Sequence, residues 1–224
     1  MAFPTSTVAR KILMALTGQF MILYVIAHVA GNSTIYAGAI NGYAEGLRHW
    51  PFTIVLWSSR VFLFLSVALH TAYGIALKLE NRRAKPEAYA VTRYRSATFA
   101  GRTMVWSGLI VLLFLAFHLL HFTFQVTNPA LSALRHPDAL GRPDVLGMVV
   151  GSFRHAGIAS IYIFSVLALG LHLYHGAESS AQTEGLNDEK SLPVVVKTGR
   201  IFSAVLFLAY AAIPVSILAG LLKQ

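Results

Sequence analysis

The chain has 224 residues, of which 56% are hydrophobic and 12% are charged, and its formal net charge is +9 at pH 7. Together with a positive mean hydropathy, this composition is typical of an integral membrane protein and excludes an ordinary soluble enzyme. The chain contains no cysteine. Disulfides, cysteine-held metal or cofactor sites and cysteine nucleophiles are therefore excluded.

Five apolar segments follow one another, and each is long enough to cross a hydrocarbon layer of about 30 Å at about 1.5 Å per residue. In lipid they must be helices, since every backbone N–H and C=O group needs an internal partner. The connections between them are too short for a soluble domain of about 50 residues or more. We therefore expect an all-α integral membrane protein with one transmembrane domain over residues 1–224. The expected spans are 12–30, 52–77, 103–126, 155–177 and 199–222.

Lysine and arginine are distributed unequally between the two sides of these spans. Twelve of the 18 lie in the N-terminal segment and in the second and fourth connections, and five lie on the opposite side. The positive-inside rule then places the N-terminus in the cytoplasm and the C-terminus outside a bacterial cytoplasmic membrane. Anionic lipid or an acidic partner surface accounts for the basic excess, so no nucleic acid is expected.

Histidines occur within the first four spans, where ionisable groups are costly and usually functional. We estimate their depths from about 1.5 Å of helix rise per residue. His28 and His118 lie about 22–24 Å from the cytoplasmic face, whereas His70 and His172 lie about 8–11 Å from it. Two pairs, each drawn from two different helices, are thus expected at two levels. The other two histidines within spans are His121 and His175.

Two imidazole pairs at two depths are the arrangement that holds two haems b inside a four-helix bundle, with one imidazole on each side of each iron. Six-coordinate iron has no open position, which suits electron transfer rather than oxygen binding. Small residues on the histidine faces indicate room for a flat macrocycle, although close helix packing explains such residues equally well. His121 and His175 are expected to contact a ligating histidine, a propionate or a quinone. The small residues are Gly31, Ser66, Ser165 and Ala168.

Two other classes of protein also place histidines in a membrane. A metal or proton transporter would normally gather its ligands at one midplane site with carboxylates or broken helices, whereas the expected spans here contain no Asp or Glu. A structural anchor would use the histidines for hydrogen bonds between helices.

Four stretches carry a resemblance to a known family. They read KILMALTGQFMILYVIAHVAGN, RVFLFLSVALHTAYGIALKLENRRAKPEAYAV, RTMVWSGLIVLLFLAFHLLHF and GLHLYHGAESSAQTEGLN. The chain resembles the di-haem cytochrome b anchors of succinate dehydrogenases and fumarate reductases, the respiratory complex II family of the tricarboxylic acid cycle. The resemblance implies that the axial ligands are His28 with His118 and His70 with His172, which agrees with the pairing by depth.

The resemblance also implies partners and a reaction. A flavoprotein with covalent FAD and an iron–sulfur subunit are expected to dock on the cytoplasmic face, with the basic connection from Lys78 to Arg102 as part of the dock. The chain itself is expected to react with membrane quinone, menaquinone being the type expected, and to carry no dicarboxylate site. Some fumarate-reducing relatives have a proton-conducting glutamate where this chain has Gly170, so we expect succinate oxidation. Fumarate reduction and another quinone-linked oxidoreductase are the alternatives.

The quinone site has candidates on both sides of the membrane, because a quinone needs hydrogen-bond donors and a proton route to water. Arg60 lies within the second span and is expected to be a buried charge that needs an anionic partner. The outer candidates are Glu45, His49, Trp50 and His155, and the inner candidates are Arg10, Arg102 and Ser180. The inner residues are alternatively expected to contact the propionates of the inner haem.

Overall fold

The computed structural model describes residues 6–84, 98–186, 188 and 190–223. Within this part of the chain there are helices and no strands, and five of the helices are long and apolar enough to cross a membrane. The predicted all-α membrane fold is therefore confirmed. The five helices are α1 (Thr7–Asn32), α3 (Phe52–Arg83), α5 (Met104–His118), α7 (Ala156–Thr183) and α8 (Ser191–Leu218).

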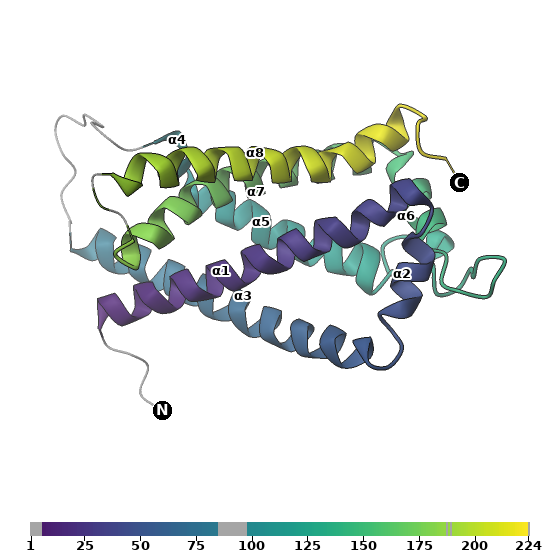
Figure 1. Ribbon diagram of the computed structural model, residues 1–224, viewed down its shortest axis with the longest axis horizontal. Helices are drawn as coiled ribbons and strands as arrows, with labels where there is room; N and C mark the ends of the chain where they lie inside the picture. The colour runs from purple at the N-terminus through teal and green to yellow at the C-terminus, as the bar shows by residue number, and fades with distance from the viewer. Residues whose placement is uncertain (1–5, 85–97, 187, 189, 224) are drawn as a thin grey trace.

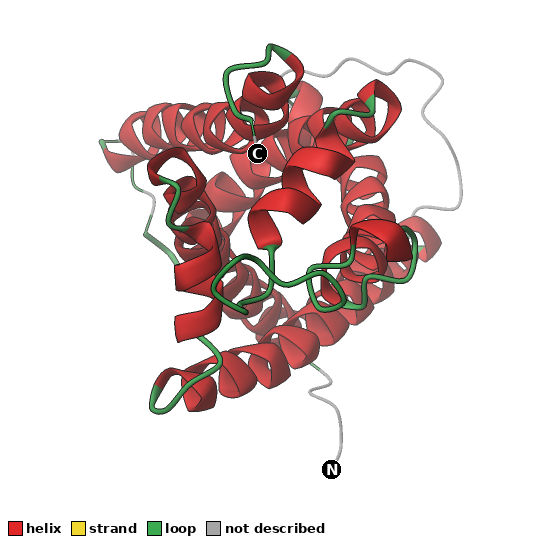
Figure 2. Cartoon of the chain, turned by 90° about the vertical axis from the view of Figure 1, so that its right-hand side faces the viewer, coloured by secondary structure: helices red, strands yellow, loops and turns green. Residues whose placement is uncertain are grey.

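The first four long helices form a bundle, and α8 lies along α7 (Figures 1 and 2). Within the bundle, α1 packs against α3 and α7, and α5 packs against α7. The N- and C-termini lie at opposite ends (Figure 1), as an odd number of crossings requires. Large apolar side chains such as Leu23, Phe64 and Leu113 are exposed on the outside, which is the surface that lipid would cover.

Several helices extend beyond the apolar segments that predict them. α7 continues to Thr183 instead of ending at residue 177, and α8 begins at Ser191 instead of residue 199. Hydropathy marks the part of a helix that crosses hydrocarbon, whereas the backbone hydrogen bonds continue into the headgroup region. The third span ends in a π-helical turn, η2 (Leu119–Thr123), rather than as a regular α-helix.

Short helices close the end of the bundle where the C-terminus lies, and we call this layer of short helices the cap. The sequence predicts only connections at this end. The side chain of Asn41 is buried in α2, donates to Asp138 (3.2 Å) and Asp144 (3.1 Å), and accepts from the backbone N–H of Leu146 (2.8 Å). These bonds tie α2 to the start of α6. The short elements are η1 (Ser33–Ala37), α2 (Ile40–Gly46), η3 (Pro129–Leu131) and α6 (Val145–Phe153).

An apolar core lies beneath this cap. Ile35, Val150 and Phe153 from the short helices pack with Tyr162 of α7 and Ile213 of α8. Val150 is completely buried, so the cap is a packed layer rather than a set of open loops. Phe114, Phe117 and Phe122 of the span that carries His118 pack against it.

We predict that the cap depends on pH through Asp138. The guanidinium of Arg142 donates to this carboxylate (2.9 Å) and, helped by backbone N–H donors, holds the pKa of Asp138 down to about 2 from its ordinary value of 3.8. Because the folded pKa is depressed, the stabilisation is complete above pH 4 and is lost as the pH falls towards 2.

The measurement is the difference in melting temperature between the wild type and Asp138→Asn in detergent. This difference should favour the wild type at pH 5 and disappear near pH 2. A constant difference across this range would show that the Asp138 carboxylate does not stabilise the cap.

Candidate functional site

Four histidines from four helices meet in two pairs inside the bundle. The ring centroids of His28 and His118 lie 5.9 Å apart, and those of His70 and His172 lie 6.2 Å apart. An imidazole nitrogen lies about 1.2 Å from its ring centroid and binds a metal at about 2.0–2.1 Å, so two imidazoles on opposite sides of one metal place their centroids about 6.4 Å apart. Both pairs therefore have the spacing of two axial ligands, and both are the pairs that depth predicts.

We call His70 with His172 the inner pair and His28 with His118 the outer pair. The hydrogen bonds of the inner pair determine which of its ring nitrogens remain available to bind a metal. His70 Nδ1 lies 3.0 Å from the carbonyl oxygen of Met14; since a carbonyl only accepts, Nδ1 carries the proton. His172 Nδ1 lies 3.2 Å from the hydroxyl of Ser107, whose own proton is donated to the carbonyl of Met104 (3.0 Å). His172 Nδ1 is therefore also a donor. In both rings Nε2 keeps its lone pair, which is the form that binds a metal.

The histidines of the outer pair have different hydrogen-bond partners. The side-chain amide nitrogen of Asn32 lies 3.4 Å from His28 Nε2, so this nitrogen accepts a weak hydrogen bond and carries a lone pair. Within the described residues, His118 Nδ1 is buried and has no hydrogen-bond partner. A buried polar atom without a partner is rare in native structures, and in this respect His118 differs from the two histidines of the inner pair.

Glycines border the inner pair from the neighbouring helices. A Cβ atom on Gly18 would lie 3.3 Å from Cε1 of His70, and one on Gly108 would lie 3.1 Å from Cε1 of His172. The sequence analysis did not identify these two glycines, because their positions opposite the histidines depend on helix packing. It had associated Gly31 with a macrocycle, but a Cβ atom on Gly31 would collide with the ring of Tyr43. Gly31 is therefore explained by the close approach of α2.

The donor set favours a macrocycle over a bare metal ion. Among the residues that the structure describes, no three His, Cys, Asp or Glu side chains come together as a metal site. Each pair supplies two imidazoles, whereas a metal held by protein alone usually has three or four protein ligands. Two facing imidazoles match the axial positions of haem iron, whose other four ligands belong to the porphyrin. The chain's own residues therefore fit two haems b.

His121 occupies a separate position beside the outer pair. It is buried in the π-helical turn η2, and its Nδ1 lies 2.9 Å from the hydroxyl of Tyr162. The Tyr162 ring also lies 5.9 Å from the ring of His118, and Phe122 stacks on His121 at 4.1 Å. Tyr162 thus connects His121 to the outer pair. The sequence analysis missed it, because a tyrosine in an apolar helix gives no signal without its neighbours.

His175 belongs to the inner end of α7. Its ring packs against Gly101, where a Cβ atom would lie 3.0 Å from Cε1. Its Nδ1 is buried without a hydrogen-bond partner in the described part of the chain. His175 does not take part in the pair of His70 and His172, so the assignment of His172 to the inner level agrees with the geometry.

The outer quinone candidates are only partly brought together. His49 Nε2 lies 2.7 Å from a carboxylate oxygen of Glu45, and Trp50 is exposed. His155 is the residue before α7, and within the described residues no hydrogen bond or ring contact joins it to the other three. The expectation that Arg60 is buried is wrong: its side chain is exposed, and its guanidinium lies 4.8 Å from the ring centroid of Trp57. One helix turn places Trp57 and Arg60 on the same face.

The inner quinone candidates also have partners of their own. Arg10 forms a two-pronged ion pair with Glu80, with one contact at 2.9 Å. Ser180 accepts a hydrogen bond from the side-chain amide of Gln19 (2.8 Å). The same amide also donates to the carboxylate of Glu184 (2.7 Å). Gln19 and Glu184, which the sequence analysis did not select, therefore form a polar cluster between α1 and α7.

No family model, no curated protein and no solved structure matches the chain in the three comparisons with known proteins.

We predict that removing the Tyr162 hydroxyl destabilises the protein. Tyr162→Phe keeps the ring but leaves His121 Nδ1 buried without its partner, which should lower the free energy of unfolding by about 1–3 kcal/mol. Tyr36→Phe is the matched control, because Tyr36 is half exposed and its hydroxyl makes only a long contact with Ser216 (3.3 Å). Both variants can be compared by chemical unfolding in detergent, and equal losses would show that the contact with His121 contributes nothing particular.

Proposed function

We propose that the chain is the membrane anchor and cytochrome b subunit of a succinate dehydrogenase, that is, of a succinate:quinone oxidoreductase. The observation that carries this proposal is the meeting of four histidines from α1, α3, α5 and α7 in two facing pairs. The sequence resemblance to di-haem anchors implies the same four residues as ligands.

In this function the histidines would hold two haems b, His28 with His118 and His70 with His172. Bis-imidazole haems supply reversible one-electron transfer without an open position for oxygen. The bond from His70 Nδ1 to Met14 and the bond from His172 Nδ1 to Ser107 fix both rings of the inner pair. Such outer bonds hold a ligand in its metal-binding tautomer and raise its basicity.

Aromatic side chains surround the His118 side of the outer pair. Phe114 and Phe122 of the third span and Tyr162 of α7 all lie against the ring of His118. An apolar and aromatic shell of this kind lowers the local dielectric response and disfavours the more highly charged state of a bound redox group. The chain therefore gives its two levels different environments, one bordered by backbone and serine acceptors and the other by aromatic rings.

The end of the bundle that carries the N-terminus is proposed to face the cytoplasm and to receive the flavoprotein and the iron–sulfur subunit. FAD and the iron–sulfur clusters belong to those subunits. The basic residues of this end support the orientation, since acidic partner surfaces and anionic lipid both favour it. Lys85, Arg93 and Arg95 of the basic connection lie outside the described residues. Membrane quinone is the other substrate, at one of the two candidate positions.

The residue at position 170 supports succinate oxidation rather than proton-coupled fumarate reduction, because the chain has a glycine where some fumarate-reducing relatives have a proton-conducting glutamate. A Cβ atom on Gly170 would lie 3.5 Å from Cβ of Phe207 and 3.6 Å from the backbone oxygen of Ser203. The position therefore faces α8 at ordinary contact distance, and it offers no carboxylate for a proton path.

The test is a redox titration of the visible spectrum, with haem and flavin counted per chain in the complex purified through a tag on this subunit. We expect two haems with the sharp alpha band of reduced low-spin haem b, and one flavin from the partner flavoprotein. Haem without flavin would point to the alternative, a cytochrome b subunit of another quinone-linked oxidoreductase. A folded chain that binds no haem would refute the proposal.

We predict that His28→Ala and His70→Ala each remove a different haem. Each variant should lose about half of the alpha-band absorbance, because one haem would lose one of the two histidines that would hold it. The two variants should retain different steps of the redox titration. His136→Ala is the control, since His136 is exposed in a connection. If either single substitution removes both redox steps from a protein that stays folded, the pairing is wrong.

A further inference from the structure

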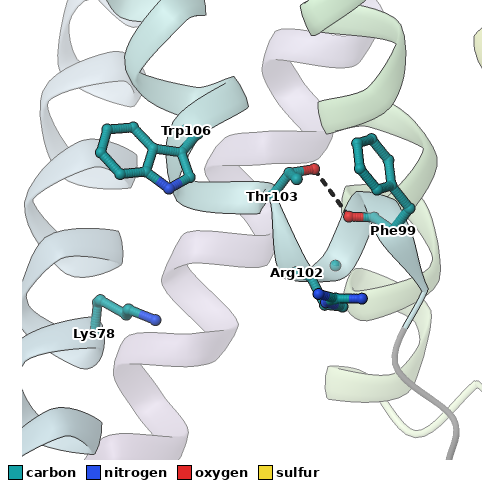
Figure 3. A pocket seen from close by; sticks show the side chains of 6 residues that line it. Lys78, Phe99, Arg102, Thr103 and Trp106 are labelled. Atoms are coloured by element: carbon teal, nitrogen blue, oxygen red, sulfur yellow. Dashed lines mark hydrogen bonds between the residues drawn. The ribbon is translucent and has the colours of Figure 1, made fainter. Parts of the chain in front are cut away.

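A basic pocket of about 440 Å³ lies at the end of the bundle that carries the N-terminus, apart from the four histidines (Figure 3). Lys78 of α3 and Arg102 of the short helix α4 (Phe99–Arg102) extend towards it from different helices, and Trp106 of α5 lies further into the membrane-spanning part (Figure 3). The residues that line it are Lys78, Phe99, Gly101, Arg102, Thr103 and Trp106.

The charged groups that line this pocket are all positive. Lys78 and Arg102 bring an ammonium and a guanidinium, Trp106 brings an indole N–H donor, and the lining contains no carboxylate. Glu80, the acidic residue near Lys78 in the sequence, is bound by the two-pronged ion pair with Arg10. Its charge is therefore largely compensated. These hydrogen-bond donors suit an anion that has several oxygen acceptors.

The position of the pocket relative to the membrane indicates which kind of anion would bind there. Phe99 and Trp106 are each about two-thirds exposed, at 67% and 68%, and exposed aromatic residues are typical of the boundary between headgroups and hydrocarbon. One helix turn deeper than Lys78 lies Ile75, and one turn deeper than Trp106 lies Leu109; both are exposed. A ligand with its charge in the pocket would therefore have apolar surface beneath it, on α3 and on α5.

We propose that this pocket binds the phosphate of an anionic phospholipid on the cytoplasmic side of the membrane, with the acyl chains lying along α3 and α5. Lys78 and Arg102 bind the phosphate oxygens, and the indole N–H of Trp106 donates to the headgroup. Basic pockets between transmembrane helices on this side are the sites at which anionic lipid headgroups bind. The proposal concerns lipid, and the lipid-binding measurement does not depend on the proposed function; only the haem reading below rests on it.

The experiment measures lipid binding to the delipidated, purified chain in detergent by native mass spectrometry. The probes are dioleoylphosphatidylglycerol and dioleoylphosphatidylcholine, which share acyl chains and differ in net charge. The wild type should hold one phosphatidylglycerol at least about tenfold more tightly than phosphatidylcholine. The double variant Lys78→Gln/Arg102→Gln should weaken phosphatidylglycerol binding about 10- to 30-fold and abolish the preference.

The matched control is Lys11→Gln/Lys197→Gln, which removes the same charge from exposed residues at the same end that do not line the pocket. It should keep the preference for phosphatidylglycerol. Equal losses in both double variants would mean a general effect of surface charge and would overturn the proposal. Equal binding of the two lipids to the wild type, or displacement of phosphatidylglycerol by 10 mM inorganic phosphate, would also overturn it.

Two further readings separate lipid binding from other roles. Haem absorbance should be the same in the wild type and in the Lys78→Gln/Arg102→Gln variant; loss of haem would assign the two cations to haem propionates instead and overturn the proposal. If that variant misfolds, as judged by circular dichroism, Lys78→Arg/Arg102→Lys and Trp106→Phe take its place. The first should retain the lipid preference, and the second should weaken it a few-fold. The opposite results would refute the site.

Discussion

The whole arrangement depends on how polar groups find partners in a solvent that offers none. Hydrocarbon cannot hydrogen-bond a backbone amide or an imidazole ring, so each histidine within a span must meet a partner from another helix or bind a group. In this chain the imidazoles meet one another in pairs across α1, α3, α5 and α7. The pairing constrains which helices are neighbours and how deep each one lies, and it joins the sequence pattern to the proposed chemistry.

The two levels satisfy this constraint in different ways. At the inner level the Nδ1 atoms of His70 and His172 donate to Met14 and Ser107, which leaves both Nε2 atoms for a metal. At the outer level the partners are fewer: Asn32 contacts His28, and His118 Nδ1 has none among the described residues. The packing therefore gives the two histidine pairs different surroundings.

The two ends of the bundle also differ from each other. One end is closed by a packed layer of short helices, tied together by Asn41 and by the Asp138–Arg142 ion pair. The other end carries the Arg10–Glu80 pair and the basic pocket of Lys78 and Arg102. One end is therefore a packed layer of short helices, whereas the other end is positively charged. The same asymmetry appears in the sequence as an unequal distribution of lysine and arginine.

The sequence alone determined the fold class and the number of spans, and it predicted which of the four histidines pair. Each of these depends on distance along one helix, which rises by a constant amount per residue. The tertiary structure decided which side chains surround each imidazole: the glycines at 18 and 108, Tyr162 beside His121, and Gln19 with Glu184 are contacts between helices far apart in the chain. It also decided that Arg60 is exposed, that Gly31 accommodates Tyr43 and that the connections form a packed cap. Such features follow from the rotation of each helix about its axis and from crossings between helices, and helical periodicity in an almost uniformly apolar span carries little information about either.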